Sequence, residues 1–131
     1  MRAGVVGLGR MGLPMTRGIA EAGIPVTVFD LKPEAVAAAV AVGGVGAESP
    51  AAVAAASDVV CIVVLDLAQV EDVLLAPTGS SRARTTGWSC ASAARSPTTR
   101  WPSSRRVAPH GVALLDAGVA VARSTPRPRV W

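Results

Sequence analysis

The chain contains no tyrosine, and its 131 residues include one histidine and one lysine, Lys32. The missing tyrosine excludes a catalytic Tyr-x-x-x-Lys pair, and the missing Gly-Lys-Ser/Thr sequence excludes a P-loop for nucleoside triphosphates. The single histidine, His110, precedes an apolar run, so we interpret it as a loop residue rather than as a catalytic acid or base. The sequence alone identifies no catalytic residue.

Cysteines and long apolar runs are also scarce. The two cysteines, Cys61 and Cys90, form neither a metal-binding spacing nor a disulfide framework, so we predict no metal site and interpret Cys61 as a core strand residue. The longest apolar runs are as short as a strand or are broken by glycine and arginine, which predicts neither a membrane span nor a signal peptide. The expectation is a cytoplasmic protein of one domain without a membrane partner.

The charges divide the chain into two unlike parts. Residues 1–76 contain four basic and eight acidic residues, whereas residues 77–131 contain nine arginines, one acidic residue (Asp116) and all three tryptophans. From Thr78 to Arg106 there is no Val, Ile, Leu, Met or Phe. Two interpretations are open: an irregular Ser/Arg/Thr/Pro-rich segment, or a basic arm whose arginines and tryptophans bind nucleic acid.

The most informative glycines are the three in Gly7-Leu8-Gly9-Arg10-Met11-Gly12, which have the spacing Gly-x-Gly-x-x-Gly. At a strand-to-helix junction this spacing allows a tight turn, a close approach of the backbone to a pyrophosphate, and close packing of the helix on the strand. The first N–H groups of the helix then bind the phosphates. About 20 residues further on, an apolar run ends at Asp30, where a dinucleotide-binding fold has the carboxylate that binds the adenine ribose. The pattern predicts a dinucleotide-binding turn rather than an ordinary tight turn.

Strand-like and helical segments alternate through the first half of the chain. A helix over residues 11–22 is expected to pack Met11, Met15 and Ile19 on the sheet. The segments that follow are a strand (25–29), a helix (34–42), a short strand (45–47), a helix (50–56), a strand (58–65) and a helix (66–75). This order predicts an α/β fold, a Rossmann-type doubly wound parallel sheet, with ligand at the carboxyl ends of the first and fourth strands. We expect the sheet to be incomplete after the fourth strand, because no fifth strand can be found between Thr78 and Arg106.

These residues resemble the β-hydroxyacid dehydrogenase family, whose cofactor domain is similar to that of 6-phosphogluconate dehydrogenase. The resemblance rests on the run from Gly4 to Met15, where Gly-x-Met-Gly-x-Pro-Met is more specific than three glycines, and on the run from Ala22 to Asp30. Further matches are Ser49 to Val53, Ser57 to Val60 and, weakly, Val64-Leu65-Asp66, where the family has Met-Leu-Pro. The resemblance covers residues 3–76, returns at His110 to Ala117, and is lost between them.

The resemblance implies hydride transfer between a nicotinamide cofactor and a small 3-hydroxy acid, with a lysine as acid and base. In the family that lysine belongs to a C-terminal helical domain, which we expect to be absent here, and Lys32 lies near the adenine ribose instead. Ala120 stands where the family has a substrate-binding serine, and Arg95-Ser96-Pro97 is only a fragment of its Ser-Thr-x-Ser-Pro turn. We therefore expect the cofactor-binding part of a dehydrogenase, inactive as this chain. A non-catalytic nucleotide-binding module or sensor is the alternative.

The expected cofactor is NAD, with NADP as the alternative, because the carboxylate of Asp30 would accept hydrogen bonds from both ribose hydroxyls and repel a 2′-phosphate. The expected partner is thus a nicotinamide dinucleotide. We expect no nucleic-acid partner, because the stretches on both sides of the basic segment belong to one cofactor domain, and no oligomer without the helical domain. The residues expected to bind the cofactor are Gly7, Leu8, Gly9, Arg10, Met11, Gly12, Asp30, Leu31, Lys32, Val64, Leu65 and Asp66.

The loss and return of family-like sequence lead to a hypothesis about the gene. We divide the chain into a dinucleotide-binding core (1–76), an irregular Arg/Ser/Thr/Pro-rich segment (77–106), a residual strand (within 107–120) and an irregular tail (121–131). A GC-rich coding sequence that is translated in a frame shifted by one base is rich in Arg, Ser, Thr, Pro, Ala and Trp, as residues 77–106 are. We predict that residues from about 78 to 106, and again from about 121 to 131, are translated in a shifted frame, with the family frame restored between them.

Overall fold

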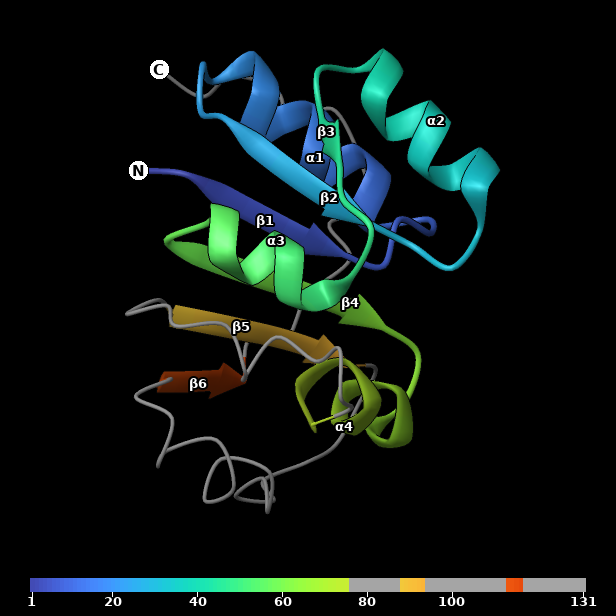
Figure 1. Ribbon diagram of the computed structural model, residues 1–131, viewed down its shortest axis with the longest axis vertical. Coiled ribbons are helices and arrows are strands. Elements are labelled where there is room, and N and C mark those ends of the chain that lie inside the picture. Colours follow the sequence, from blue (N-terminus) through green and yellow to red (C-terminus); the bar gives the residue numbers. More distant parts are fainter. Residues whose placement is uncertain (76–87, 94–112, 117–131) are drawn as a thin grey trace, which may run out of the picture.

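A computed structural model describes residues 1–75, 88–93 and 113–116 of the chain. Six parallel strands form one sheet in the order β3-β2-β1-β4-β5-β6, and Figure 1 shows them side by side from β3 at one edge to β6 at the other. This order is that of a doubly wound Rossmann sheet, in which the direction of winding reverses between β1 and β4. The strands are β1 (Ala3–Val6), β2 (Val26–Phe29), β3 (Val45–Gly46), β4 (Val59–Val64), β5 (Trp88–Ala93) and β6 (Ala113–Asp116).

The described residues form four helices: α1 (Gly12–Glu21), α2 (Pro33–Ala41), α3 (Pro50–Ala56) and α4 (Leu67–Leu75). The local sequence sets their ends as predicted. Ser49 Oγ accepts the Ala52 N–H at 3.1 Å at the start of α3, and Gly23 follows α1 with a positive φ of 73°. Within the described ranges, no helix is both long enough and apolar enough to span a bilayer.

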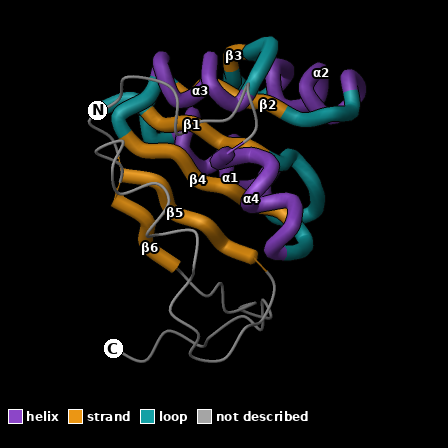
Figure 2. The backbone as a smooth tube through the Cα atoms, turned by 60° about the horizontal axis from the view of Figure 1, so that its bottom comes forward, coloured by secondary structure: helices purple, strands orange, loops and turns teal. Residues whose placement is uncertain are grey.

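Along β1, β2 and β4 the side chains alternate between two hydrophobic cores, one on each face of the sheet. On β1, Val5 faces a core that includes Ala39 of α2, whereas Val6 faces a second core that includes Val53 of α3 and Leu74 of α4. α1 and α2 therefore cover one face of the sheet, and α3 and α4 cover the other. Figure 2 shows the strands of this sheet and the helices packed around it.

The face that α1 turns to the sheet agrees only in part with the predicted one, because Ile19 packs against the core as predicted but Met11 and Met15 do not belong to that core. Gly12 and Thr16 are the buried residues of α1, whereas Met11 and Met15 are only partly buried. A Cβ on Gly12 would collide with the carbonyl oxygen of Gly7. The helix thus approaches the strand closely at Gly12, as the glycine spacing predicts. The Thr16 hydroxyl is satisfied in this buried position because it donates to the Gly12 carbonyl at 2.9 Å.

The prediction that no fifth strand lies between Thr78 and Arg106 is wrong. β5 lies in this interval and pairs in parallel with β4 on one side and with β6 on the other. Its sequence, Trp-Ser-Cys-Ala-Ser-Ala, lacks the β-branched and aliphatic residues by which strands are recognised, but the backbone ladder does not depend on them. β6 lies inside the stretch 107–120, for which the sequence predicts a residual strand. The rest of 77–106 and all of 121–131 lie outside the described residues.

Candidate functional site

The turn between β1 and α1 lies where three strands meet at the carboxyl edge of the sheet. Gly7 has a positive φ of 92°, and its N–H donates to the carbonyl of Phe29, the last residue of β2, at 2.9 Å. A Cβ on Gly7 would collide with the carbonyl oxygen of Val63 in β4. Gly7 is therefore required both by the backbone angle and by the neighbouring strand. The junction of β1 with β4 is the switch point at which doubly wound sheets bind ligands.

The first and third glycines of the turn serve the packing of the protein, but Gly9 does not. Gly9 is exposed, and a Cβ at this position would meet no atom of the described chain within 4 Å. The described part of the chain therefore does not require glycine at position 9. The open space beside its backbone fits the role of the second glycine in a dinucleotide fold, which is to let a pyrophosphate approach closely.

The start of α1 has neither a side-chain cap nor an acidic residue in its first turn, whereas α2, which also has no side-chain cap, has Glu34 in its first turn. The N-cap residue of α1 is Met11, which makes no side-chain hydrogen bond. By contrast, Ser49 caps α3 and the Asp66 side chain accepts the Gln69 N–H in the first turn of α4. The partial positive charge and the N–H groups at this end of α1 are thus suited to an anion such as the pyrophosphate of a dinucleotide.

Asp30 follows β2 and lies beside the glycine turn. One carboxylate oxygen, Oδ2, accepts the Leu8 N–H at 2.7 Å, and the other, Oδ1, accepts the Lys32 N–H at 2.9 Å. Each carboxylate oxygen can accept a second hydrogen bond, so ribose hydroxyls could bind at the same group. Leu31, between these residues, is 89% exposed. Asp30 and Leu8 are 22 residues apart in the sequence, and the fold brings them into contact.

The end of β4 supplies the third part of the predicted site. A Cβ on Gly7 would lie 3.3 Å from Cγ1 of Val64, so this residue borders the turn. Asp66 has a structural role at the start of α4, because its Oδ1 accepts the Gln69 N–H at 2.9 Å. Gln69 in turn accepts the Leu65 N–H through Oε1 at 3.0 Å. The sequence interpretation missed Gln69, although a carboxylate followed three residues later by glutamine is typical of a helix start.

Several residues that the sequence singled out are not placed by the structure. His110, Ala120 and the Arg95-Ser96-Pro97 fragment all lie outside the described residues.

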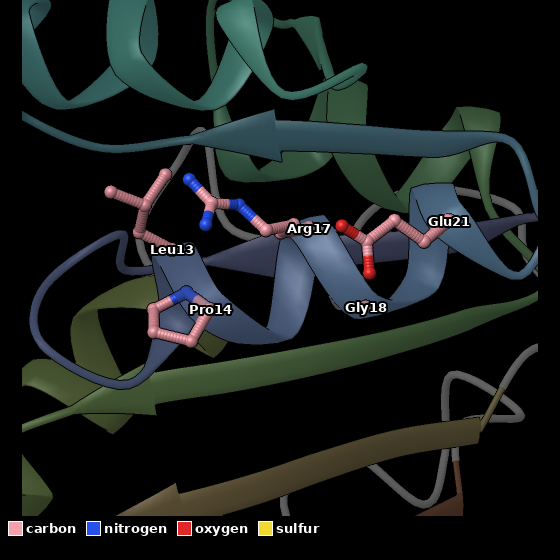
Figure 3. Close-up of a pocket in the computed structure, with 5 residues that line it drawn as sticks. All are labelled: Leu13, Pro14, Arg17, Gly18 and Glu21. Carbon is pink, nitrogen blue, oxygen red and sulfur yellow. The ribbon is translucent and has the colours of Figure 1, made fainter.

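The groove in Figure 3 is a separate feature, which runs along α1 and is lined by Leu13, Pro14, Arg17, Gly18 and Glu21. It contains none of the residues expected to bind the cofactor, so we do not assign it to the site.

The profile of one protein family, described as the NAD binding domain of 6-phosphogluconate dehydrogenase, matches residues 2–124 of the chain. The chain belongs to this family. Its NAD-binding domain is that of the β-hydroxyacid dehydrogenases, as predicted from the glycine turn. The match extends across residues 77–106, where the residue pattern alone shows no resemblance.

Relatives of known name agree with this assignment. L-threonate dehydrogenase from Cupriavidus necator is 36% identical over 118 residues, which are 89% of this chain and 40% of the relative. 2-Hydroxy-3-oxopropionate reductase from Escherichia coli is 38% identical over 87 residues, which are 66% of this chain and 30% of that protein. The 3-hydroxyisobutyrate dehydrogenase of Salmonella typhimurium superimposes with a TM-score of 0.79 at 29% identity, over 92% of this chain and 42% of that structure. The chain thus spans about 40% of the length of L-threonate dehydrogenase.

Proposed function

We propose that this domain binds NAD in preference to NADP and is the cofactor half of a dehydrogenase that acts on a small 3-hydroxy acid. The observation that supports the proposal most directly is the position of the Asp30 carboxylate beside the Leu8 N–H of the glycine turn. The named relatives support the substrate class, because two of them are a dehydrogenase of a hydroxy acid and a reductase of a hydroxy-oxo acid. When bound, the nicotinamide ring supplies the hydride chemistry.

The chain's own residues would bind and orient the dinucleotide. The open backbone at Gly9 and the start of α1 would bind the pyrophosphate, with the Arg10 guanidinium, which is exposed in the same turn, available to neutralise charge. Asp30, Leu31 and Lys32 would surround the adenine ribose. Val64, Leu65 and Asp66, at the end of β4, would lie toward the nicotinamide half. In this assignment every group binds the cofactor and none transfers a proton to substrate.

The preference for NAD follows from the charge of Asp30. A ribose with two hydroxyls would donate to the carboxylate, each bond contributing about 1.5 to 3 kcal/mol. A 2′-phosphate would instead meet a like charge, at a cost on the order of several kcal/mol before salt screening. The exposed side chain of Lys32 offsets part of this repulsion. We expect NADH to bind at least about tenfold more tightly than NADPH.

Fluorescence titration of the purified chain with NADH and NADPH tests this preference. In the variant Asp30→Asn the difference between the two cofactors should shrink, because the amide does not repel a phosphate. The variant Glu48→Gln removes a carboxylate from a position with no side-chain hydrogen bond in the described structure, and should leave the difference unchanged. Tighter binding of NADPH than of NADH by the unmodified chain would show that the preference is wrong.

We further propose that this chain by itself does not oxidise 3-hydroxy acids. Its only lysine is Lys32, whose backbone N–H donates to Asp30 in the loop after β2, the part of the site that the proposal assigns to the adenine ribose. Loss of a general acid and base typically lowers the rate about 10² to 10⁴-fold. NAD reduction should therefore stay at background with 3-hydroxyisobutyrate or D-glycerate in a preparation free of host dehydrogenase. NADH binding without turnover is also what a nucleotide sensor would show, whereas robust turnover would contradict both the lack of activity and the sensor alternative.

A further inference from the structure

The Asp30 side chain joins two loops at the carboxyl edge of the sheet. Its Oδ2 atom accepts the N–H of Leu8, in the turn after β1, at 2.7 Å, and its Oδ1 atom accepts the N–H of Lys32 at 2.9 Å. Lys32 is the residue from which α2 starts, because its carbonyl accepts the N–H of Ala35 at 3.0 Å. One carboxylate therefore connects the predicted phosphate-binding turn, the end of β2 and the first turn of α2.

The hydrogen bond from Leu8 to Asp30 continues the contact between β1 and β2 one residue beyond their last backbone hydrogen bond. The Gly7 N–H donates to the Phe29 carbonyl at 2.9 Å, and the N–H of the following residue meets the Asp30 side chain. The Leu8 side chain is 3% exposed and belongs to the core that also contains Val28. The turn is thus held at Leu8 by apolar packing of the side chain and by a charged acceptor on the backbone. Hydrogen bonds to charged groups are among the stronger ones in proteins.

We propose that Asp30 is a positioning residue for the phosphate-binding turn, in addition to the ribose contact that belongs to the proposed function on which this inference rests. By holding Leu8 and Lys32, the carboxylate keeps the turn in one shape whether or not a dinucleotide is bound. Asp30 would then contribute to affinity twice, once through the ribose and once through the preorganised backbone at Gly9 and α1. Preorganised sites bind more tightly because less conformational freedom is lost on binding.

Amide hydrogen exchange of the full chain, read residue by residue by NMR without added nucleotide, tests this role. In Asp30→Ala the Leu8 amide should exchange about tenfold faster or more, relative to the Val28 amide in the same sample. The reference amide lies in the fully buried centre of β2 and corrects for any change in global stability. Asp30→Asn keeps the size of the side chain and one acceptor oxygen, so it should show a smaller effect in the same direction and protects the experiment against loss of folding.

Asp58→Asn is the matched control, because Asp58 also accepts a backbone N–H, that of Arg2, at 2.8 Å. It lies beside the amino end of β4 and should leave both the Leu8-to-Val28 ratio and the NADH affinity unchanged. An unchanged ratio in both Asp30 variants, with NADH binding by the unmodified chain intact, would overturn the positioning role alone. If the Asp30 variants change the ratio of Leu8 to Val28 exchange but the unmodified chain does not bind NADH, the positioning role is supported and the proposed function is contradicted.

Discussion

The turn between β1 and α1 contains three glycines, and each position has a different physical relation to the rest of the fold. Gly7 requires a positive φ, Gly12 lies against the Gly7 carbonyl, and Gly9 is unconstrained by the described protein. The first two are therefore determined by folding. No contact in the described protein accounts for the third, and the proposed function assigns it to the approach of a pyrophosphate.

Alanine substitutions should separate these roles. Gly12→Ala should lower the free energy of unfolding by about 3 kcal/mol, because its Cβ would overlap a backbone oxygen that cannot move aside easily. Gly9→Ala should change the free energy of unfolding by less than about 0.5 kcal/mol, since the position is open. It should nonetheless weaken NADH binding about tenfold, because a methyl group would then occupy the space beside the pyrophosphate.

Urea denaturation of each variant, followed by NADH titration of those that fold, makes this measurement. Gly9→Ala serves as the stability control for Gly12→Ala. If Gly9→Ala binds NADH as tightly as the unmodified chain, the pyrophosphate does not lie against this turn in the way proposed.

The strands β1 and β4 are joined at their amino ends by a charged pair. The Arg2 Nη2 atom donates to Asp58 Oδ1 at 2.8 Å, and the Arg2 backbone N–H donates to Oδ2 at 2.8 Å. Both side chains are about half exposed, at 55% and 45%. The pair thus helps to set the register of two central strands, with a modest contribution to stability that salt weakens.

This pair should make stability depend on pH in a defined direction. The hydrogen bond from the Arg2 side chain, followed by that from its backbone, lowers the pKa of Asp58 from its ordinary 3.8. A carboxylate whose pKa is lower in the folded state stabilises the fold above the unfolded pKa, and this stabilisation is lost as the pH falls through the folded pKa. The difference in urea midpoint between the unmodified chain and Asp58→Asn should therefore be largest near neutral pH and shrink below about pH 4. A difference that grows with acid would refute the assignment, and added salt should reduce it at neutral pH.

β5 shows that a strand can be held between two neighbours with little help from its own composition. Its residues are mostly Ser, Ala and Cys, and its register pairs Ala91 with Ile62 of β4 and with Asp116 of β6. A parallel strand between two others uses backbone groups on both of its sides. The stability of β5 should therefore depend on the backbone ladder.

Proline in β5 tests this dependence. Ala91→Pro removes an N–H and fixes φ within the ladder, and should lower the free energy of unfolding by about 3 kcal/mol or more. Ala91→Ser keeps the N–H and the small side chain, so its effect should stay within about 1 kcal/mol. Urea denaturation compares the two variants. Equal stability of the proline and serine variants would mean that β5 does not take part in the cooperative unfolding of the sheet.

At the level of the whole chain, composition and family membership do not coincide. The arginine-rich part begins near residue 77, yet the family match runs from residue 2 to residue 124, and β5 lies inside the arginine-rich part. The family match therefore continues through a stretch whose composition differs from that of the first half of the chain. The hypothesis of a shifted reading frame accounts for both facts, because compensating insertions and deletions change residues while keeping distance along the chain.

The coding sequence decides this hypothesis. Translation of the other two frames over codons 78–106 should yield an apolar strand, followed by a Ser-Thr-x-Ser-Pro-like turn. The codons for residues 1–76 are the control, since their own frame already gives family-like sequence and the other two should not. If neither alternative frame yields such a strand, the composition of this segment has another origin.

The sequence by itself determined the features that depend on neighbouring residues. Glycine spacing, the Ser49-Pro50 helix start and the apolar runs of β1, β2 and β4 are local signals, and they correctly predicted the first four strands, the helices between them and the position of Asp30 at the end of β2. The family was identified from the same local residues. Only the tertiary structure decided the features that depend on contacts between distant residues. These include the bond of Asp30 to Leu8 and the pairing that makes β5 a strand. In both cases backbone groups pair with residues far away in the sequence, and the periodicity of the side chains does not indicate such a contact.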